Sequence, residues 1–515
     1  MAARRRSYWS QRAGGLLLAA AAGVFGPGAA IAERTPTPDA PMGFRGDGTG
    51  RFPDATPLTE WSAGENVLWR ADMPDWSNSQ PVVAGDFVYT CSEPTTLLCV
   101  RRSDGKVLWQ RTHDYVDLLP PEKREEVLKE LVGAERLRKA KLDPLKKRLQ
   151  EVNRELQRLP KDPFLTRQKG SLQREVQKLQ EKLAALEEYR PPRADPVLGH
   201  SNCTPVADGQ GVFALFGNGV GAVYDLEGRQ KWLRAIRRPK MPLGFSMSPV
   251  LAGEALVMSM DKEILAVDSR TGKDLWTVST YRPSAGLAAA KVGPVPVVAT
   301  AEGSVIRASD GRMMARVEQT ATTALCAPMV HEGVLYLLGA NQRLLMELLL
   351  PDGADGVKLE SVAAGQAFLG THYGSPLYHN GCVYFWDKGH VLSVVSAKSG
   401  RTIRTKRLGL SGTAYASPTL GGKHIFLGTD DGAIAVIEPV ITPAPGGKLS
   451  LDLKEVAVNR LDATRSSPVF AGKCMFLRTL KYLYCIGPKE GGPDGPPGKD
   501  DNPFRLGVYS PAGGR

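Results

Sequence analysis

The stretch that decides the fold is residues 246–276, SMSPVLAGEALVMSMDKEILAVDSRTGKDLW. Residues 256–260 and 264–268 are short apolar runs with the composition of β-strands. A polar turn separates them, and the Thr271-Gly272 turn leads into a further strand at Trp276. With the strand that follows Pro249, the unit predicts four short antiparallel strands.

The opening proline of this unit recurs along the chain. Most gaps between copies are 42 to 50 residues, a spacing typical of four-stranded propeller blades. A gap of 124 residues before the second copy indicates an insertion, and the fourth copy is short and degenerate. The eight copies open at Pro81, Pro205, Pro249, Pro296, Pro328, Pro376, Pro418 and Pro468. The repeat therefore predicts an all-β fold, an eight-bladed β-propeller.

The missing outer strand of the last copy is found at the other end of the repeat region. Residues 66–70, NVLWR, are similar to residues 106–110, KVLWQ, of the first copy. We expect the N-terminal strand to complete the last blade and so to close the ring without a free sheet edge. Tryptophans at one repeated position are expected to pack between blades. They are Trp69, Trp109, Trp232 and Trp276.

The insertion, residues 113–199, has a helical composition. Residues 142–159 and 172–186 each carry leucine and valine at alternating steps of three and four, which is typical of coiled-coil seams. Prolines at 160 and 163 break the pattern between them. The sequence predicts an antiparallel α-helical coiled-coil hairpin, preceded by a helix over about 122–141 that ends at Asp143. We expect the hairpin to project from the face where the inner strands begin.

The ends of the chain differ from the repeat region. Residues 1–32 have four arginines, an apolar stretch and small residues at 30–32, which predicts a signal peptide; a retained membrane anchor is the alternative. We divide the rest into an N-terminal extension (33–65), the propeller (66–487) and a disordered Gly/Pro-rich tail (488–515). Export places the mature protein in the periplasm or outside the cell, with no transmembrane span after signal removal.

The net charge of +12 does not indicate a nucleic-acid-binding protein. The signal contributes four arginines and no acids, and residues 122–190 contribute 19 basic and 13 acidic residues. The positive charge therefore belongs mainly to the insertion, and no basic stripe with aromatic residues accompanies it.

Metal, redox and nucleophile motifs are missing from the sequence. The seven cysteines show no C-x-x-C spacing, and buried cysteines acting as small apolar residues are expected. A turn near Thr479 and Leu480 would place Cys474 opposite Cys485, so these two form a possible disulfide. Asp430-Asp431-Gly432 could suggest calcium, but its place at a hairpin favours turn chemistry.

The repeat resembles the PQQ-like eight-bladed propeller family over roughly residues 66–487. The turn-plus-tryptophan pattern is residues 266–276, AVDSRTGKDLW, and residues 44–50, FRGDGTG, are similar to the start of many secreted members. The family includes quinoprotein dehydrogenases, which bind PQQ and calcium, and outer-membrane assembly lipoproteins, which serve as docking scaffolds. The adjacent cysteines and calcium cluster of the dehydrogenases, and the lipid-attachment cysteine of the lipoproteins, do not occur here.

The resemblance and the missing motifs favour an exported, non-catalytic scaffold without cofactor or metal that binds a partner protein or a cell-envelope polymer. The alternative is a PQQ-dependent or other oxidoreductase that uses the channel. Residues before the opening prolines are expected to line the channel mouth and, with the hairpin, to bind the partner. They are Trp76, Asn78, His200, Asn202, Phe245, His372, Tyr373, Tyr415 and Arg465.

Overall fold

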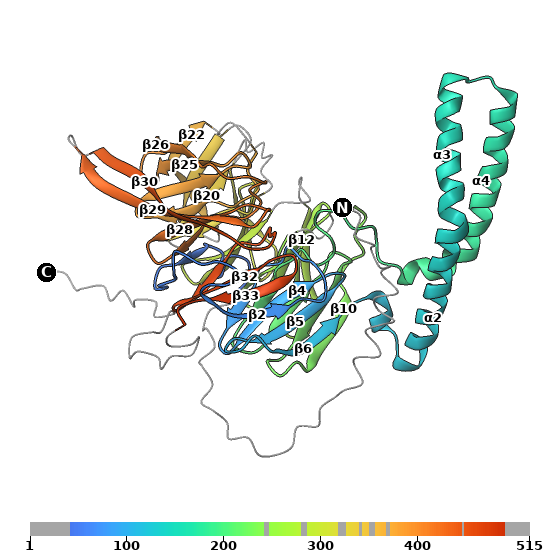
Figure 1. The fold of residues 1–515 in the computed structure, drawn as a ribbon, viewed down its shortest axis with the longest axis horizontal. Coiled ribbons are helices and arrows are strands. Elements are labelled where there is room, and N and C mark those ends of the chain that lie inside the picture. The colour runs from blue at the N-terminus through green and yellow to red at the C-terminus, as the bar shows by residue number, and fades with distance from the viewer. Residues whose placement is uncertain are drawn as a thin grey trace, which may run out of the picture. The chain divides into compact units, whose positions relative to one another are not determined.

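The computed structural model describes residues 42–241, 247–279, 286–317, 326–338, 342–349, 356–366, 371–444 and 448–489. These residues form two compact units (Figure 1). The β unit comprises the described residues before Asp114 and after Pro192, and the helical unit comprises residues 114–192. The predicted signal peptide and most of the predicted tail lie outside the described residues.

The β unit consists of eight sheets within the described residues, and each contains a set of four strands that pair antiparallel. The first four are β3–β6 (Val82–Ala84, Phe87–Ser92, Thr96–Arg101, Val107–Thr112), β7–β10 (Val206–Ala207, Val212–Leu215, Val220–Tyr224, Gln230–Ala235), β11–β14 (Val250–Ala252, Ala255–Met260, Glu263–Asp268, Asp274–Ser279) and β15–β18 (Leu287–Val292, Val295–Thr300, Ser304–Arg307, Met313–Arg316).

The second four sheets follow the same plan. They are β19–β22 (Met329–His331, Val334–Leu338, Gln342–Leu349, Lys358–Gln366), β23–β26 (Leu377–His379, Cys382–Trp386, Val391–Ser396, Thr402–Arg407), β27–β30 (Thr419–Gly421, His424–Gly428, Ala433–Ala444, Lys448–Arg460) and β31–β33 (Val469–Ala471, Cys474–Arg478, Tyr482–Ile486) with β2 (Val67–Asp72). A short strand, β1 (Arg51–Phe52), pairs parallel with β27. The first strand of each sheet is called its inner strand below.

Seven of the eight opening prolines directly precede an inner strand, as predicted. Pro296 does not, because it lies within the second strand of its sheet, β16. The inner strand of that sheet, β15, follows Gly286 instead and has no opening proline. The assignment of the fourth opening to Pro296 was therefore wrong. Because β15 begins before Pro296, the distance from the third inner strand to the fourth differs from the predicted one, and the next distance is closer to the usual repeat length.

The N-terminal strand completes the last sheet, as predicted. Strand β2 pairs antiparallel with β33, and Trp69 lies opposite Cys485. The Trp69 ring lies 6.0 Å from the Phe476 ring and packs in one buried cluster with Val88 and Leu98 of the first sheet. A strand from the start of the chain thus joins the last sheet and packs against the first.

A repeated contact between tryptophan and glycine joins consecutive sheets. Each of the four tryptophans lies on a turn glycine of the next sheet, where an added Cβ would come within 2.5–2.9 Å of the indole ring. Each glycine has a positive φ, which a larger residue rarely adopts. The pairs are Trp69 with Gly105, Trp109 with Gly228, Trp232 with Gly272, and Trp276 with Gly311. The predicted packing role of these tryptophans is confirmed.

The register of β32 and β33 differs from the sequence prediction. Phe476 lies opposite Cys485, so Cys474 and Cys485 are not opposite each other. The turn is centred on Leu480 and Lys481, because Thr479 N donates to Tyr482 O, and this moves the register by two residues. The predicted cross-strand pairing of Cys474 with Cys485 was therefore wrong.

The helical unit contains α2 (Pro121–Leu137), α3 (Asp143–Arg158) and α4 (Pro163–Leu183), with short 3-10 helices at Tyr115–Leu118 and Ala184–Tyr189. Helices α3 and α4 lie side by side (Figure 1). Leu142, Val176 and Leu183 are buried in one cluster between them. The predicted break falls between Arg158 and Pro163.

The end of the first helix was predicted wrongly. A π-helical turn, Arg138–Leu142, connects α2 directly to α3. A π turn tolerates the local loss of an α-helical hydrogen bond at Pro144, which has no backbone N–H. Among the described residues, no helix is both long enough and apolar enough to span a membrane.

We predict that Trp69→Ala destabilises the β unit strongly, since it empties a buried site between the last and first sheets. The expected loss is about 3–5 kcal/mol in the free energy of unfolding, measured by urea titration. The control, Leu108→Ala, changes a 38% exposed side chain on β6 and should cost no more than about 0.5 kcal/mol. Equal effects of the two variants would contradict the role of Trp69.

Candidate functional site

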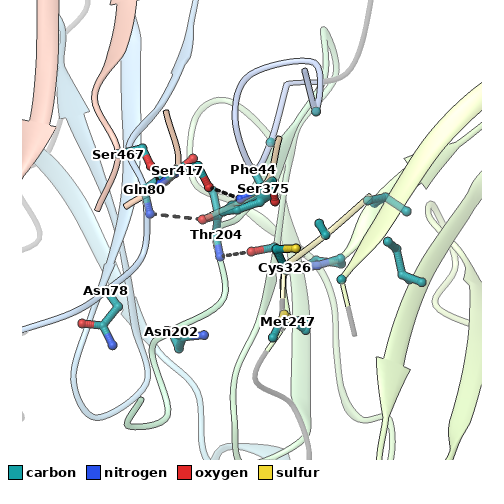
Figure 2. A pocket seen from close by; sticks show the side chains of 18 of the residues that line it. Phe44, Asn78, Gln80, Asn202, Thr204, Met247, Cys326, Ser375, Ser417 and Ser467 are labelled. Carbon is teal, nitrogen blue, oxygen red and sulfur yellow. Dashed lines mark hydrogen bonds between the residues drawn. The ribbon is translucent and has the colours of Figure 1, made fainter. Parts of the chain in front are cut away.

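A cavity of about 480 Å³ lies in the β unit and is lined by residues at the inner strands of all eight sheets (Figure 2). Each sheet contributes residues just before or within its inner strand. The size is within the range of sites that bind small molecules or a few peptide side chains. It is called the central cavity below.

Hydrogen bonds between residues that precede the opening prolines link neighbouring inner strands. In each bond, a backbone N–H of one sheet donates to a hydroxyl oxygen of the next sheet. The four bonds are Gln80 to Thr204 (3.1 Å), Thr204 to Ser248 (2.9 Å), Ser375 to Ser417 (3.0 Å) and Ser417 to Ser467 (2.8 Å). Figure 2 shows several of them along one side of the cavity. This linkage explains why serine or threonine so often precedes the opening proline.

The fourth and fifth sheets have no hydroxyl at this position. Gly286 and Ala327 stand there, and a Cβ added to Gly286 would lie 2.4 Å from the Ala327 Cβ. The cavity wall on this side is formed by Met247, Leu287 and Ala288 among others. The cavity therefore has a hydroxyl-bearing side and an apolar side.

Residues 42–56, here called the N-terminal segment, cover the end of the cavity where the inner strands finish. Met42 bridges to Ala207, and Phe52 pairs with Gly421 at the ends of their inner strands. Phe52 also packs edge-on against Phe470, with 5.6 Å between ring centroids. The segment contacts the second, seventh and eighth sheets in this way and closes one end of the cavity.

Arg45 fixes the N-terminal segment inside the β unit. Its backbone N–H donates to the Gln80 side chain at 2.7 Å, and its Nη2 donates to the Pro418 carbonyl at 3.2 Å. The side chain is 1% exposed, and burial lowers the pKa of the guanidinium to about 10. Gly50 is required beside it, because a Cβ there would lie 2.5 Å from Arg45 Nη2.

Three residues at the opposite end of the cavity form a stacked group. The Tyr373 and Tyr415 rings are stacked with centroids 4.9 Å apart, and Arg465 Cζ lies 5.3 Å from the Tyr415 centroid. All three are partly exposed. A cation on an aromatic pair at a cavity entrance is suited to binding a group that carries negative charge.

Five of the nine predicted mouth residues line the cavity. They share one repeat position, three residues before the opening proline, and are Asn78, Asn202, Tyr373, Tyr415 and Arg465. Trp76, His200 and His372 are not among the lining residues. His200 and His372 are buried in the protein, and Phe245 lies outside the described residues. Choosing only the residues that lie three positions before an opening proline would have kept these five and left out Trp76, His200 and His372.

Glu93 was not singled out from the sequence, although it holds the loop that returns from the insertion. Its Oε1 accepts hydrogen bonds from His200 N (2.8 Å), Ser201 N (2.6 Å) and Ser201 Oγ (2.7 Å). Residues 195–201, here called the return segment, also contribute Asp195, Val197 and Leu198 to the cavity wall. Glu93 is 107 residues from His200 in the sequence, so no local pattern reveals the contact.

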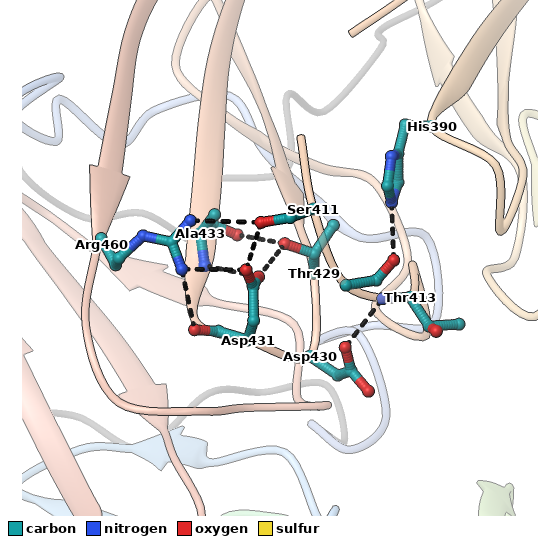
Figure 3. Close-up of polar contacts among 9 residues, drawn as sticks. His390, Ser411, Thr413, Thr429, Asp430, Asp431, Ala433 and Arg460 are labelled. Atoms are coloured by element: carbon teal, nitrogen blue, oxygen red, sulfur yellow. Dashed lines mark hydrogen bonds and ion pairs between the residues drawn. The ribbon is translucent and has the colours of Figure 1, made fainter. Parts of the chain in front are cut away.

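Asp430 and Asp431 serve a turn, in agreement with the sequence interpretation (Figure 3). Asp431 accepts hydrogen bonds from Ser411 Oγ (2.5 Å), Thr429 Oγ1 (2.7 Å) and Arg460 Nη1 (2.9 Å). Burial alone would raise the pKa of Asp431, but these hydrogen bonds together hold it well below its usual value. Both carboxylate oxygens are therefore engaged within the seventh sheet.

The residues of the cavity do not fit a calcium–quinone site. Asp47 Oδ1 accepts hydrogen bonds from Thr49 N and Thr49 Oγ1, and Asp195 Oδ1 accepts from Val197 N and Leu198 N. A calcium ion needs six to eight converging oxygens. No group of three or more His, Cys, Asp or Glu side chains suitable for a metal occurs in the described part of the chain.

A family model described as outer membrane protein assembly factor BamB matches residues 55–114, 185–278 and 260–359. These residues belong to the PQQ-like repeat family. The matched repeats include the Trp69, Trp109, Trp232 and Trp276 contacts described above. No curated protein matches the chain at a significant level.

Solved structures similar to the chain share little sequence with it. The crystal structure of BamB from Moraxella catarrhalis is 11% identical, with a TM-score of 0.41, and the match covers 54% of this chain and 82% of that one. The computationally designed Ika8 protein is 10% identical, with a TM-score of 0.38 and coverage of 54% and 93%. Kluyveromyces lactis Hsv2 is 11% identical, with a TM-score of 0.35 and coverage of 52% and 85%. The assignment to PQQ-like repeats rests on the sequence match and on the repeated contacts.

We predict that Glu93→Gln changes the pH dependence of stability. Burial raises the pKa of Glu93 to about 7, from about 4.3 in an unfolded chain. The folded protein therefore binds this proton more tightly, and the free energy of unfolding falls as the pH rises from about 4 to 7. Glutamine keeps the accepting oxygen but does not ionise. The variant should match the parent at pH 4 and exceed it at pH 8 by about 1–3 kcal/mol.

Urea titrations at the two pH values measure this difference. The control is Glu60→Gln, which changes an exposed carboxylate and should follow the parent at both pH values. A stability difference for Glu93→Gln that is the same at pH 4 and pH 8 would show that the carboxylate does not titrate in this range.

Proposed function

We propose that the eight sheets are the blades of a closed propeller and that the protein is an exported, non-catalytic scaffold. It binds a partner protein, or a cell-envelope polymer, at the open end of the central cavity. The observation that carries the proposal is the asymmetry of the cavity. One end is covered by the N-terminal segment, while the other presents Tyr373, Tyr415 and Arg465.

Contacts between inner strands support the closed ring. The inner strand β3 of the first sheet contacts β7 of the second and β31 of the last, and β27 contacts both β23 and β31. The pairing of β2 with β33 adds a link between the two ends of the repeat region. We propose that the helices α3 and α4 form a coiled-coil hairpin that assists partner binding.

A non-catalytic role is supported by the chemistry of the cavity. The acidic residues that line it, Asp47 and Asp195, accept hydrogen bonds from their own loops. Cys326, which also lines it, is buried, and burial raises the pKa of its thiol to about 11. At neutral pH this cysteine is a thiol, which is a poor nucleophile.

We predict that variants of the mouth and of the hairpin weaken partner capture by different routes. Tyr415→Ala with Arg465→Glu removes the stacked cation and should abolish capture from the extract of the producing cells. Replacing residues 122–190 by a short Gly/Ser bridge should leave the β unit folded and weaken capture. The control, Val458→Glu, changes a 49% exposed side chain on β30 and should retain capture.

Capture is measured by quantitative mass spectrometry against the unchanged protein. If the mouth variant captured every partner with unchanged affinity, the proposed binding site would be wrong. If only the hairpin deletion had no effect, the mouth would remain the site and the insertion would have no part in binding.

We predict that the protein incubated with PQQ and calcium shows no oxidation of alcohols or sugars in a dye-reduction assay. The expectation follows from the poor fit of the cavity oxygens to a calcium site. Dye reduction that depends on both additives and is lost on chelation would contradict the scaffold proposal and favour the oxidoreductase.

A further inference from the structure

We propose that the central cavity binds the carboxyl-terminal end of an extended peptide with apolar side chains. This proposal rests on the proposed function and names the chemistry that the site recognises. The observations behind it are polar atoms at the cavity that have no hydrogen-bond partner, the cation Arg465 at the entrance, and the apolar side of the cavity.

Asn78 and Arg465 meet at the same backbone carbonyl of the return segment. Asn78 Nδ2 donates to Val197 O at 2.9 Å, and Arg465 Nη1 donates to the same oxygen at 3.3 Å. The amide orientation of Asn78 is fixed by this bond, so its Oδ1 is an acceptor. Asn78 Oδ1 and Arg465 Nε are both buried atoms without a hydrogen-bond partner.

These atoms are enclosed in the unliganded protein, so a ligand that displaces Val197 O from Arg465 and Asn78 is needed to reach them. Asn78 Oδ1 requires a donor, and Arg465 Nε requires an acceptor. Ser375 Oγ, on a residue that is 1% exposed, also lines the cavity and has no partner. A peptide supplies N–H donors beside carbonyl acceptors, whereas an acyl chain supplies no donor.

The charge of Arg465 favours a carboxylate at the end of that peptide. Arg465 stacks over Tyr415, and its contacts in the described structure include no carboxylate. Its bond to Val197 O is long, and a carboxylate accepts a shorter and stronger bond from guanidinium. A terminal carboxylate can therefore replace Val197 O on Arg465.

The apolar side chains of the peptide then pack against the apolar side of the cavity. Met247, Leu287 and Ala288 lie on the side where Gly286 and Ala327 replace hydroxyl-bearing residues. Burial of aliphatic side chains there excludes water from the Arg465 bond and strengthens it. The cavity volume of about 480 Å³ limits the bound portion to a few residues.

The experiment uses the mature protein and three probes in calorimetric titrations. The probes are acetyl-Ala-Ala-Leu with a free carboxylate, the same peptide with a carboxyl-terminal amide, and decanoate. We expect the free acid to bind with a dissociation constant below about 1 mM and the amide to bind at least tenfold more weakly. Decanoate should bind more weakly than the free acid, because it cannot donate to Asn78.

Substitutions assign the effect to named atoms. Arg465→Gln should weaken the free acid at least tenfold and leave the amide unchanged, and Arg465→Lys should restore part of the loss. Asn78→Leu should weaken the free acid and the amide alike. The control, Arg404→Gln, removes a half-exposed arginine paired with Asp452 on the sixth and seventh sheets and should change nothing.

Equal binding of acid and amide, or binding of the acid that is unchanged in Arg465→Gln, would overturn the proposal. Tighter binding of decanoate than of the peptide would indicate an acyl ligand and would also overturn it. If no probe binds while the mouth variant still loses its partner, the scaffold function stands and the terminal-carboxylate chemistry is wrong. An unchanged unfolding midpoint for Arg465→Gln excludes misfolding as the cause of its loss of binding.

Discussion

The structure depends on the contact of one tryptophan with a turn glycine of the next sheet. A four-stranded antiparallel sheet buries its faces only against neighbouring sheets, so each sheet must pack on the next in one fixed position. The Trp232 ring lies over Gly272, and its Nε1 donates to Ser269 O at 3.0 Å. The positive φ of the glycine and the flat ring of the indole together set the approach of the two sheets. Trp69 extends the same contact to the junction of the last sheet and the first.

The sequence was most informative where a residue recurred at one repeat position. Each copy of the repeat must satisfy the same physical requirements. For this reason the sequence predicted the opening prolines, the packing tryptophans and the strand at 66–70. The failures have a different origin. The strand register at Cys485 depends on which two residues form the turn, and a shift of the turn centre by one residue moves the register by two. Pro296 matches the opening prolines in residue type, but it lies within β16 and not before an inner strand.

The sequence predicted less of the site than of the fold. Nine residues shortly before the opening prolines were expected at the mouth, and five of them line the cavity, whereas Trp76, His200 and His372 do not. By contrast, Glu93 and Arg45 act through partners that are distant in the sequence: Glu93 through His200, and Arg45 through Pro418. A single copy of each residue gives no periodic signal. The closure of one end by the N-terminal segment could be found only from the three-dimensional structure, because its glycine-rich stretch has no strand pattern.

Among the described residues, the N-terminal segment covers one end of the cavity, and the mouth residues and the return segment lie at the other, where we propose that the partner binds. The most direct test is hydrogen–deuterium exchange of the protein with and without its captured partner. The account predicts slowed exchange of backbone amides in residues 195–201 and 411–417 when the partner binds. Protection confined to the outer strands or to the helices α3 and α4, with these two stretches unchanged, would contradict it.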